Sequence, residues 1–174
     1  MGLVVLKGQI GFKSWVILIV SILMAVYHLY FATLGFLTEM TWRAGHLLFA
    51  AVLILLSYPI TSGKSGWRVL DWLLILFAIV AGFYIIIEYP NMSLRMGAPL
   101  VRDVVIGAIS IVIVLEITRR TLGWPLLTIA VFFLLYALFG NYLPGIISHR
   151  GFDFDRVVTQ TYMTLEGITA SHWE

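Results

Sequence analysis

One carboxylate and two guanidinium groups stand close together at the edge of a strongly apolar stretch. The string VLEITRRTLGW, residues 114–124, places Glu116 three and four residues before Arg119 and Arg120. On a helix these spacings bring the three side chains to one face, with the acid nearer the N-terminus, as the helix dipole favours. The functional hypothesis is a proton or ion site. The favoured alternative is an ion pair that ends a helix, since basic residues flank membrane spans routinely.

A second charged group precedes the same apolar stretch. Asp103 directly follows Arg102, and Arg95 lies eight residues before Asp103 across the string MGAP. A carboxylate in the first turn of a helix accepts hydrogen bonds from unpaired N–H groups and faces the positive end of the dipole. Helix capping is therefore the first explanation for Asp103. A clamp for a substrate carboxylate, formed by Arg95 and Arg102, is the sharper hypothesis.

Histidines are the remaining candidates for chemistry. Arg43 and His46 lie one turn apart in TWRAGHLLF, while His28 and His149 are distant in sequence. No two histidines have the i, i+4 spacing that presents a pair of imidazoles to a metal on one helix face. The pattern favours hydrogen bonds between helices over a metal site. A redox or enzymatic role for His28 and His46 is kept as an alternative.

Several functional classes are excluded or disfavoured by what the sequence lacks. With no Cys, the chain cannot form disulfides, thiolate zinc sites or iron–sulfur clusters. The sequence contains no G-x-S-x-G, no H-E-x-x-H and no Gly-rich phosphate loop. Its net charge is +2 with scattered basic residues, so no basic stripe would follow a nucleic acid. We expect no enzyme activity, no cofactor in this chain and no nucleic-acid partner.

The elements that carry these residues are apolar enough to need a membrane. Hydrophobic residues make up 61% of the 174-residue chain and charged residues only 11%, against about 25% in soluble domains. A helix needs about 20 apolar residues to cross a bilayer. Five runs approach that length, at residues 15–37, 44–60, 70–87, 104–118 and 124–143. We predict an all-α integral membrane protein with about five hydrophobic helices: four transmembrane helices plus one interfacial helix or fifth span.

The connections and the C-terminal segment complete a single polytopic domain over residues 1–174. Turn-forming residues predict loops at 61–67, 89–100 and 121–125. An N-terminal segment covers residues 1–14, transmembrane helices cover 15–143, and an interfacial segment covers 144–174. In segment 144–174 apolar residues recur at helical spacing, which predicts a short amphipathic helix on the membrane surface, with a solvated loop as the alternative. They are Phe152, Phe154, Val157, Val158, Tyr162 and Leu165.

The distribution of basic residues gives a weak prediction of orientation. Five spans with the N-terminus in the cytoplasm place six basic residues inside and five outside. The inside set is Lys7, Lys13, Lys64, Arg68, Arg119 and Arg120, and the outside set is Arg43, Arg95, Arg102, Arg150 and Arg156. With four spans the two termini would share a side of the membrane.

Four strings of this sequence resemble a family of transporters. They are RAGHLLFAAVLILLSYP (43–59), LRMGAPLVRDVVIG (94–107), VLEITRRTLGWPL (114–126) and YALFGNYLPGIISHRGFDFDRVVTQTYMTLEGI (136–168). Together they are similar to the N-terminal region of the fused permeases of tripartite ATP-independent periplasmic (TRAP) transporters, and most of all to the TAXI-type branch. The resemblance covers residues 42–168, and the LE-x-x-RR-x-x-G and YLPG…H-x-G strings are its most specific parts.

The resemblance implies a function that the residues alone do not. In that family this region corresponds to the small membrane subunit, called Q. The large membrane subunit, called M, carries the substrate and sodium sites, and a periplasmic binding protein delivers the substrate. By resemblance, this chain would be a scaffold in the cytoplasmic (inner) membrane of a bacterium or archaeon, in a symporter for organic acids driven by sodium or protons. It would be a separate subunit or part of a fused permease.

On this interpretation the charged residues are structural or interface residues. They would lock helix ends within the chain or against the large subunit, in contact with the lipid bilayer. The set is Arg43, His46, Arg95, Arg102, Asp103, Glu116, Arg119 and Arg120. The alternative function is a stand-alone membrane structural or assembly protein without a role in transport.

Overall fold

A computed structural model of the chain describes residues 11–35, 38–60, 65–94 and 98–162. This part of the chain is helical, without strands, which confirms the predicted all-α class. Its α-helices are α1 (Phe12–Leu34), α2 (Glu39–Ser57), α3 (Ser65–Leu94), α4 (Val101–Thr121), α5 (Trp124–Phe139) and α6 (Phe154–Tyr162). Two short 3₁₀ helices, η1 (Gly140–Tyr142) and η2 (Gly145–Ile147), lie between α5 and α6.

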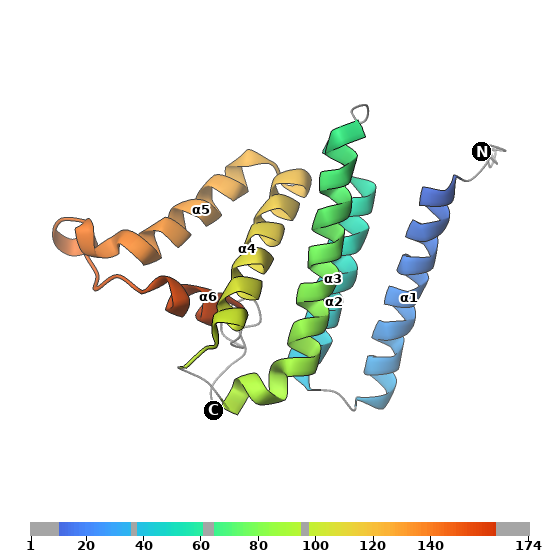
Figure 1. Ribbon diagram of the computed structural model, residues 1–174, viewed down its shortest axis with the longest axis horizontal. Coiled ribbons are helices and arrows are strands. Elements are labelled where there is room, and N and C mark those ends of the chain that lie inside the picture. Colours follow the sequence, from blue (N-terminus) through green and yellow to red (C-terminus); the bar gives the residue numbers. More distant parts are fainter. Residues whose placement is uncertain (1–10, 36–37, 61–64, 95–97, 163–174) are drawn as a thin grey trace.

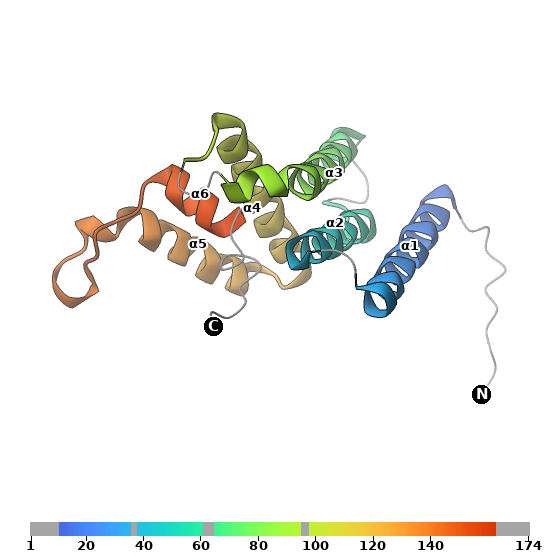
Figure 2. The same cartoon turned by 90° about the horizontal axis from the view of Figure 1, so that it is seen from below.

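Helices α1, α2, α3 and α4 stand side by side, and α5 leans away from them (Figure 1). Helices α2 and α3 form an antiparallel pair, with α1 against the outer side of α2 and α4 next to α3. Figure 2 shows α5 and α6 on the far side of α4 from α1. One buried cluster joins α2 and α3 to α4 through Leu55, Ile75 and Ile113. The central unit is therefore the packed trio of α2, α3 and α4.

Within the part of the chain that the structure describes, four segments are long and apolar enough to cross a membrane, so the chain is a multi-pass membrane protein. They are Phe12–Leu34, Glu39–Ser57, Val69–Met92 and Trp124–Tyr142. The fifth predicted span, 104–118, also forms a helix, but α4 is not among the four because charged residues stand at both of its ends. The described residues thus form six α-helices, four of them long and apolar enough to span a membrane, which agrees only in part with the predicted five hydrophobic helices and one amphipathic helix.

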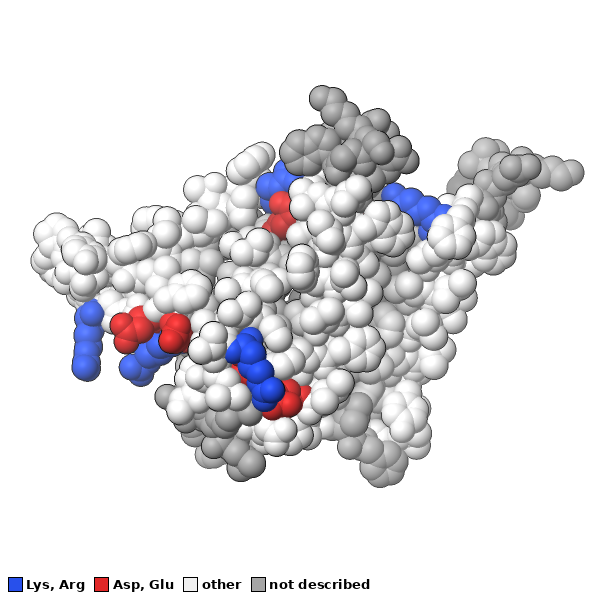
Figure 3. All heavy atoms as spheres, in the orientation of Figure 1, with Lys and Arg blue, Asp and Glu red and all other residues white. Residues whose placement is uncertain are grey.

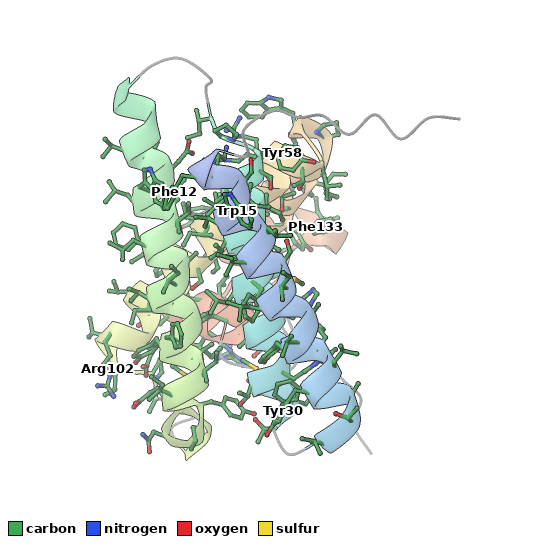
Figure 4. The ribbon with its side chains drawn as sticks, turned by 90° about the vertical axis from the view of Figure 1, so that its right-hand side faces the viewer. Phe12, Trp15, Tyr30, Tyr58, Arg102 and Phe133 are labelled. Atoms are coloured by element: carbon green, nitrogen blue, oxygen red, sulfur yellow. The ribbon has the colours of Figure 1, made fainter. Side chains whose placement is uncertain are left out.

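Aromatic side chains mark the two ends of the bundle. On α1, Trp15 is 50% exposed and Tyr30 is 49% exposed. Figure 4 shows Phe12, Trp15 and Tyr58 toward one end of the bundle and Tyr30 toward the other. Trp and Tyr are enriched where a membrane meets water, because their rings are apolar and their polar atoms remain hydrated. Trp15 and Tyr30 are about 22 Å apart along the helix axis at 1.5 Å per residue, compatible with the two faces of a bilayer.

Two of the predicted loops are wrong in extent, because α3 is longer than its apolar run. It begins at Ser65, inside the predicted loop 61–67, and continues to Leu94, inside the predicted loop 89–100. Pro90 lies within the helix. A proline lacks the N–H and kinks a helix rather than ending it when neighbouring packing holds both parts. Figure 1 shows the last part of α3 turned away from its long axis, while Met92, 1% exposed, anchors it in the core.

The predicted amphipathic helix forms as α6, and it packs on α4. Val158 is 1% exposed and Tyr162 is 6% exposed. A Cβ on Gly107 of α4 would lie 2.6 Å from Val158 Cγ1, so only glycine permits this approach. The Tyr162 hydroxyl donates to the Ala81 carbonyl oxygen at 2.8 Å, and burial raises the pKa of this phenol. Of the residues predicted to form this helix, Leu165 lies outside the described residues.

Candidate functional site

The three residues at the end of α4 form the ion pairs that their spacing predicts. Arg119 Nε lies 2.8 Å from Glu116 Oε2, and Arg120 Nε lies 2.8 Å from Glu116 Oε1. The glutamate therefore accepts from both guanidinium groups of its own helix face. Arg119 is the more exposed of the two, at 30% of its side chain, and its guanidinium carbon also lies 5.9 Å from the Trp124 ring centroid.

Asp71 of α3 completes this group, and sequence reasoning missed it. Arg120 Nη1 lies 2.8 Å from Asp71 Oδ1, and their side chains are only 3% and 10% exposed. The sequence did contain a signal for Asp71, because it stands inside the apolar string VLDWLLILF. A carboxylate within a membrane span is expected to pair with another polar group and is a candidate functional residue. Spacing within one helix could not reveal the pair, because the partner is 49 positions later in the sequence.

The same two side chains also bind backbone groups after α2. Arg120 Nη1 donates to the Tyr58 carbonyl oxygen at 2.9 Å, and the Ile60 N–H donates to Asp71 Oδ2 at 3.3 Å. The last turn of a helix leaves carbonyl groups without intrahelical partners, and here a guanidinium group supplies one donor. We call Asp71, Glu116, Arg119 and Arg120 the upper network. It joins the end of α2, the start of α3 and the end of α4.

A second polar group joins α3 and α4 at the opposite end of the bundle. Asp103 is fully buried and accepts from the Leu100 N–H at 3.0 Å, which confirms the capping prediction. It also accepts from the Tyr84 hydroxyl. Arg102 Nη2 lies 2.7 Å from Glu88 Oε1, so the basic side chain of the proposed clamp pairs with an acid of the same chain. Tyr84, Glu88, Arg102 and Asp103 are the lower network.

Of the two arginines predicted to clamp a substrate carboxylate, the structure describes only Arg102. Arg102 is at the lower network, at the N-terminal end of α4. Arg95, the other half of that clamp, lies outside the described residues.

The histidines of α1 and α2 form the interhelical hydrogen bond that the sequence favours. His28 Nε2 lies 2.8 Å from His46 Nδ1, and His28 Nδ1 lies 2.7 Å from the Met24 carbonyl oxygen. A carbonyl only accepts, so His28 Nδ1 carries a proton, and in the neutral pair His46 Nδ1–H donates to His28. Arg43 pairs instead with Glu39. Among the described residues, no three His, Asp or Glu side chains are placed to hold a metal ion.

His149 fastens the segment between α5 and α6. His149 Nε2 donates to the Tyr136 carbonyl oxygen at 2.9 Å, and the Gly151 N–H donates to His149 Nδ1 at 3.0 Å. A Cβ on Gly140 would overlap the imidazole ring, and Gly151 has φ 70°, which favours glycine. These contacts give the H-x-G part of the YLPG…H-x-G string a structural role.

The two networks bound an apolar band. On the face drawn in Figure 3, blue and red atoms lie along the upper and lower edges, with uncoloured atoms between them. Asp71 and Glu88 stand about 26 Å apart along α3 at 1.5 Å per residue, close to the ~30 Å hydrocarbon thickness of a bilayer. Each network pairs carboxylates with guanidinium groups of other helices or the same helix. This arrangement locks helix ends at the two levels where a bilayer would meet water.

Comparison with protein-family models, with curated proteins and with solved structures finds no match for this chain. Its function is therefore argued from the two networks, the faces of its helices and the resemblance of its sequence strings.

Proposed function

We propose that this chain is a small membrane scaffold subunit of a secondary active, binding-protein-dependent transporter of the TRAP type. It would hold a large membrane subunit in the bilayer while that subunit moves an organic acid, driven by a sodium or proton gradient. The membrane would be the inner membrane of a bacterium or archaeon. The proposal combines the resemblance of the four strings with the locked arrangement of α2, α3 and α4.

The observation that carries the proposal is the position of the charged residues. Asp71 and Arg120 are nearly buried and bind each other across two helices. A transport site needs groups that can exchange partners, whereas these side chains are also bonded to backbone at Tyr58 and Ile60. Doubly anchored ion pairs favour a rigid brace over a moving part.

The outer helices offer the surfaces that a brace needs. Helices α1 and α5 have no buried residues in this chain. On α5, Phe132 is 62% exposed and Phe133 is 61% exposed, and Figure 4 marks Phe133. In lipid such faces are ordinary, but the same faces can pack against helices of a larger subunit by van der Waals contact. We place the contact with the large subunit on α5, which leans away from the bundle.

Affinity purification in mild detergent tests the partnership. The tagged chain, produced in its own host, is expected to retain one large hydrophobic membrane protein in stoichiometric amount. Phe132→Ala combined with Phe133→Ala should reduce that retention at least fivefold, while Val112→Ala, at a 59% exposed position on α4, should not. Insertion into the membrane is measured for all variants by carbonate extraction.

The alternative is a stand-alone structural or assembly protein, and the same purification separates it from the proposal. Recovery of the chain alone, or only with copies of itself, would support the alternative. In proteoliposomes with an imposed sodium gradient, the isolated chain should not take up organic acids. Uptake by the isolated chain would contradict the scaffold proposal outright.

A further inference from the structure

A cavity of about 280 Å³ lies where α2, α3 and α4 meet. Ala51 of α2 and Ala78 of α3 line it and supply little side-chain volume. Ile113, Val114 and Ile117 of α4 form the opposite wall. The space is open on one side, and Trp42 and His46, both exposed, stand in its lining, so a ligand could enter it from the surface of the bundle.

Two hydroxyl groups on the cavity wall and one histidine nitrogen are bonded to the protein. The Ser110 hydroxyl donates to the Ile106 carbonyl oxygen at 2.9 Å, and the Tyr162 hydroxyl donates to the Ala81 carbonyl oxygen at 2.8 Å. His46 bonds His28. Most of the remaining lining residues are apolar, so a polar ligand would leave its own groups unpaired against much of this wall, which costs free energy. The wall fits an apolar ligand.

The end of the cavity near the start of α2 has a different character. Arg43 and Trp42 line it there, and Arg43 is the charged member of the described lining. Arg43 donates one bond to Glu39, yet a guanidinium group has five N–H donors and can bind a second anion at the same time. Trp at the boundary between an apolar region and water is typical of a membrane interface.

The length of the cavity matches half of a bilayer. Arg43 and Ala51, both on its wall, are about 12 Å apart along α2 at 1.5 Å per residue. One leaflet contributes about 15 Å of hydrocarbon, half of the ~30 Å core. A helix with its side chains is about 10–12 Å wide, whereas an extended acyl chain is much thinner. A narrow space between three packed helices therefore suits an acyl chain better than a whole partner helix.

We propose that this cavity holds one acyl chain of a glycerophospholipid, with the lipid phosphate bound by Arg43. The membrane supplies this ligand at high local concentration, and a guanidinium group binds a phosphate through charge-assisted hydrogen bonds. The bound chain fills the junction of the three helices and so contributes to the packing of the bundle. The inference does not depend on a role in transport.

Photolabelling of the full chain in nanodiscs tests this site. The nanodiscs contain phosphatidylcholine with a small fraction of phosphatidylglycerol that carries a diazirine on one chain. Mass spectrometry after illumination should find the label on α2 and α4 residues of the cavity wall, several-fold above the label on the exposed face of α5. Equal labelling of both surfaces would overturn the proposal, since it would mean ordinary contact with the bilayer.

Two residues of α4 provide a matched pair of variants. Val114 lines the cavity, whereas Val112 is 59% exposed on the same helix. Val114→Trp should fill the cavity and reduce labelling of its wall at least fivefold, and Val112→Trp should leave it unchanged. Ala78→Leu fills the same space from α3 and serves if Val114→Trp does not fold. Undiminished labelling in a folded filling variant would refute the site.

The head-group part of the proposal has its own variant. Arg43→Gln should reduce labelling of the cavity wall about threefold, because the phosphate loses its charged partner. Arg150→Gln, at an exposed loop position outside the cavity, is the control and should have no effect. If Arg43→Gln leaves the labelling unchanged, the assignment of the phosphate to Arg43 is wrong.

Discussion

Arg120 is the residue on which the upper network depends. Its guanidinium group binds two carboxylates, Glu116 and Asp71, and also the Tyr58 carbonyl oxygen. Its neighbour Arg119 is ten times more exposed, at 30% against 3% of the side chain, and binds one carboxylate. Loss of one member of a buried pair leaves the other charge uncompensated, which costs much more than loss of a surface pair.

The two adjacent arginines therefore give a controlled comparison. Arg120→Gln should lower the free energy of unfolding by about 3–5 kcal/mol, the range for a broken buried pair. Arg119→Gln should cost at most about 1 kcal/mol. Thermal unfolding of the purified chain in one detergent measures both variants. Equal losses for the two variants would mean that the upper network does not lock the helices.

Glu116 allows a test of the ion-site hypothesis that its sequence position raises. If Glu116 only holds the two arginines, Glu116→Ala should destabilise the chain more than Glu116→Gln, because the amide still accepts hydrogen bonds. Ion pairs at i,i+3 and i,i+4 within one helix contribute roughly 0.2–0.5 kcal/mol each, which sets the size of the difference. Thermal unfolding is measured alongside uptake by the assembled transporter. Abolished uptake with Glu116→Gln at unchanged stability would instead identify a proton carrier.

At the scale of elements, α6 is held by shape as much as by chemistry. Its packing on α4 depends on Gly107, where a side chain would collide with Val158 and come within 3.1 Å of Tyr162. Such close approach of backbones through a glycine is a common way for helices to pack in membranes. The amphipathic helix predicted for the membrane surface thus has its apolar face against the protein.

Gly107→Ala should loosen α6, at a cost of about 1–3 kcal/mol for overpacking. Val158→Ala removes the methyl group that would collide with the new Cβ. The double variant should therefore lose less stability than the sum of the losses in the two single variants. Hydrogen–deuterium exchange of residues 154–162 reports the docking of α6 directly. Gly11→Ala is the control, since nothing lies within 4 Å of its Cβ position. Additive effects in the double variant would contradict the contact.

For the whole molecule, the charged levels and the aromatic ends predict how the bundle lies in a membrane. The upper network, the start of α1 and the start of α5 share one end of the bundle, and the lower network shares the other with the start of α2. In this placement α4 would cross the bilayer together with α2 and α3. Its charged residues exclude it from the helices that are apolar enough to span by composition alone. The apolar band between the two levels then lies in hydrocarbon.

Cysteine labelling checks this placement, because the chain has no native Cys. We expect a membrane-impermeant maleimide added to intact cells to react with Asn91→Cys, near the end of α3, and not with Thr121→Cys, at the end of α4. Both positions are exposed, and Val112→Cys in the apolar band should be unreactive. Labelling of Asn91→Cys and Thr121→Cys from the same side would show that α4 does not span. Labelling of Thr121→Cys alone would reverse the orientation.

Some features of this protein follow from local sequence and were predicted. The helical class, the apolar segments and the pairing of Glu116 with Arg119 and Arg120 depend on composition and on spacings within one helix turn. The capping by Asp103 is equally local, because it joins residues three positions apart. A hydrogen bond between helices was predicted for the histidines, although not which two of them would pair.

Only the tertiary structure decided which distant groups meet. Asp71 pairs with Arg120 across 49 positions, and Tyr84 bonds Asp103, because the helices pack in a register that no single-helix period encodes. The extension of α3 through Pro90 and the docking of α6 on Gly107 likewise depend on packing that overrides local signals. The apolar composition of these segments is enough to place them in a bilayer. How they pack against one another depends on the volumes of their side chains and on their buried charges, which meet only in the folded chain.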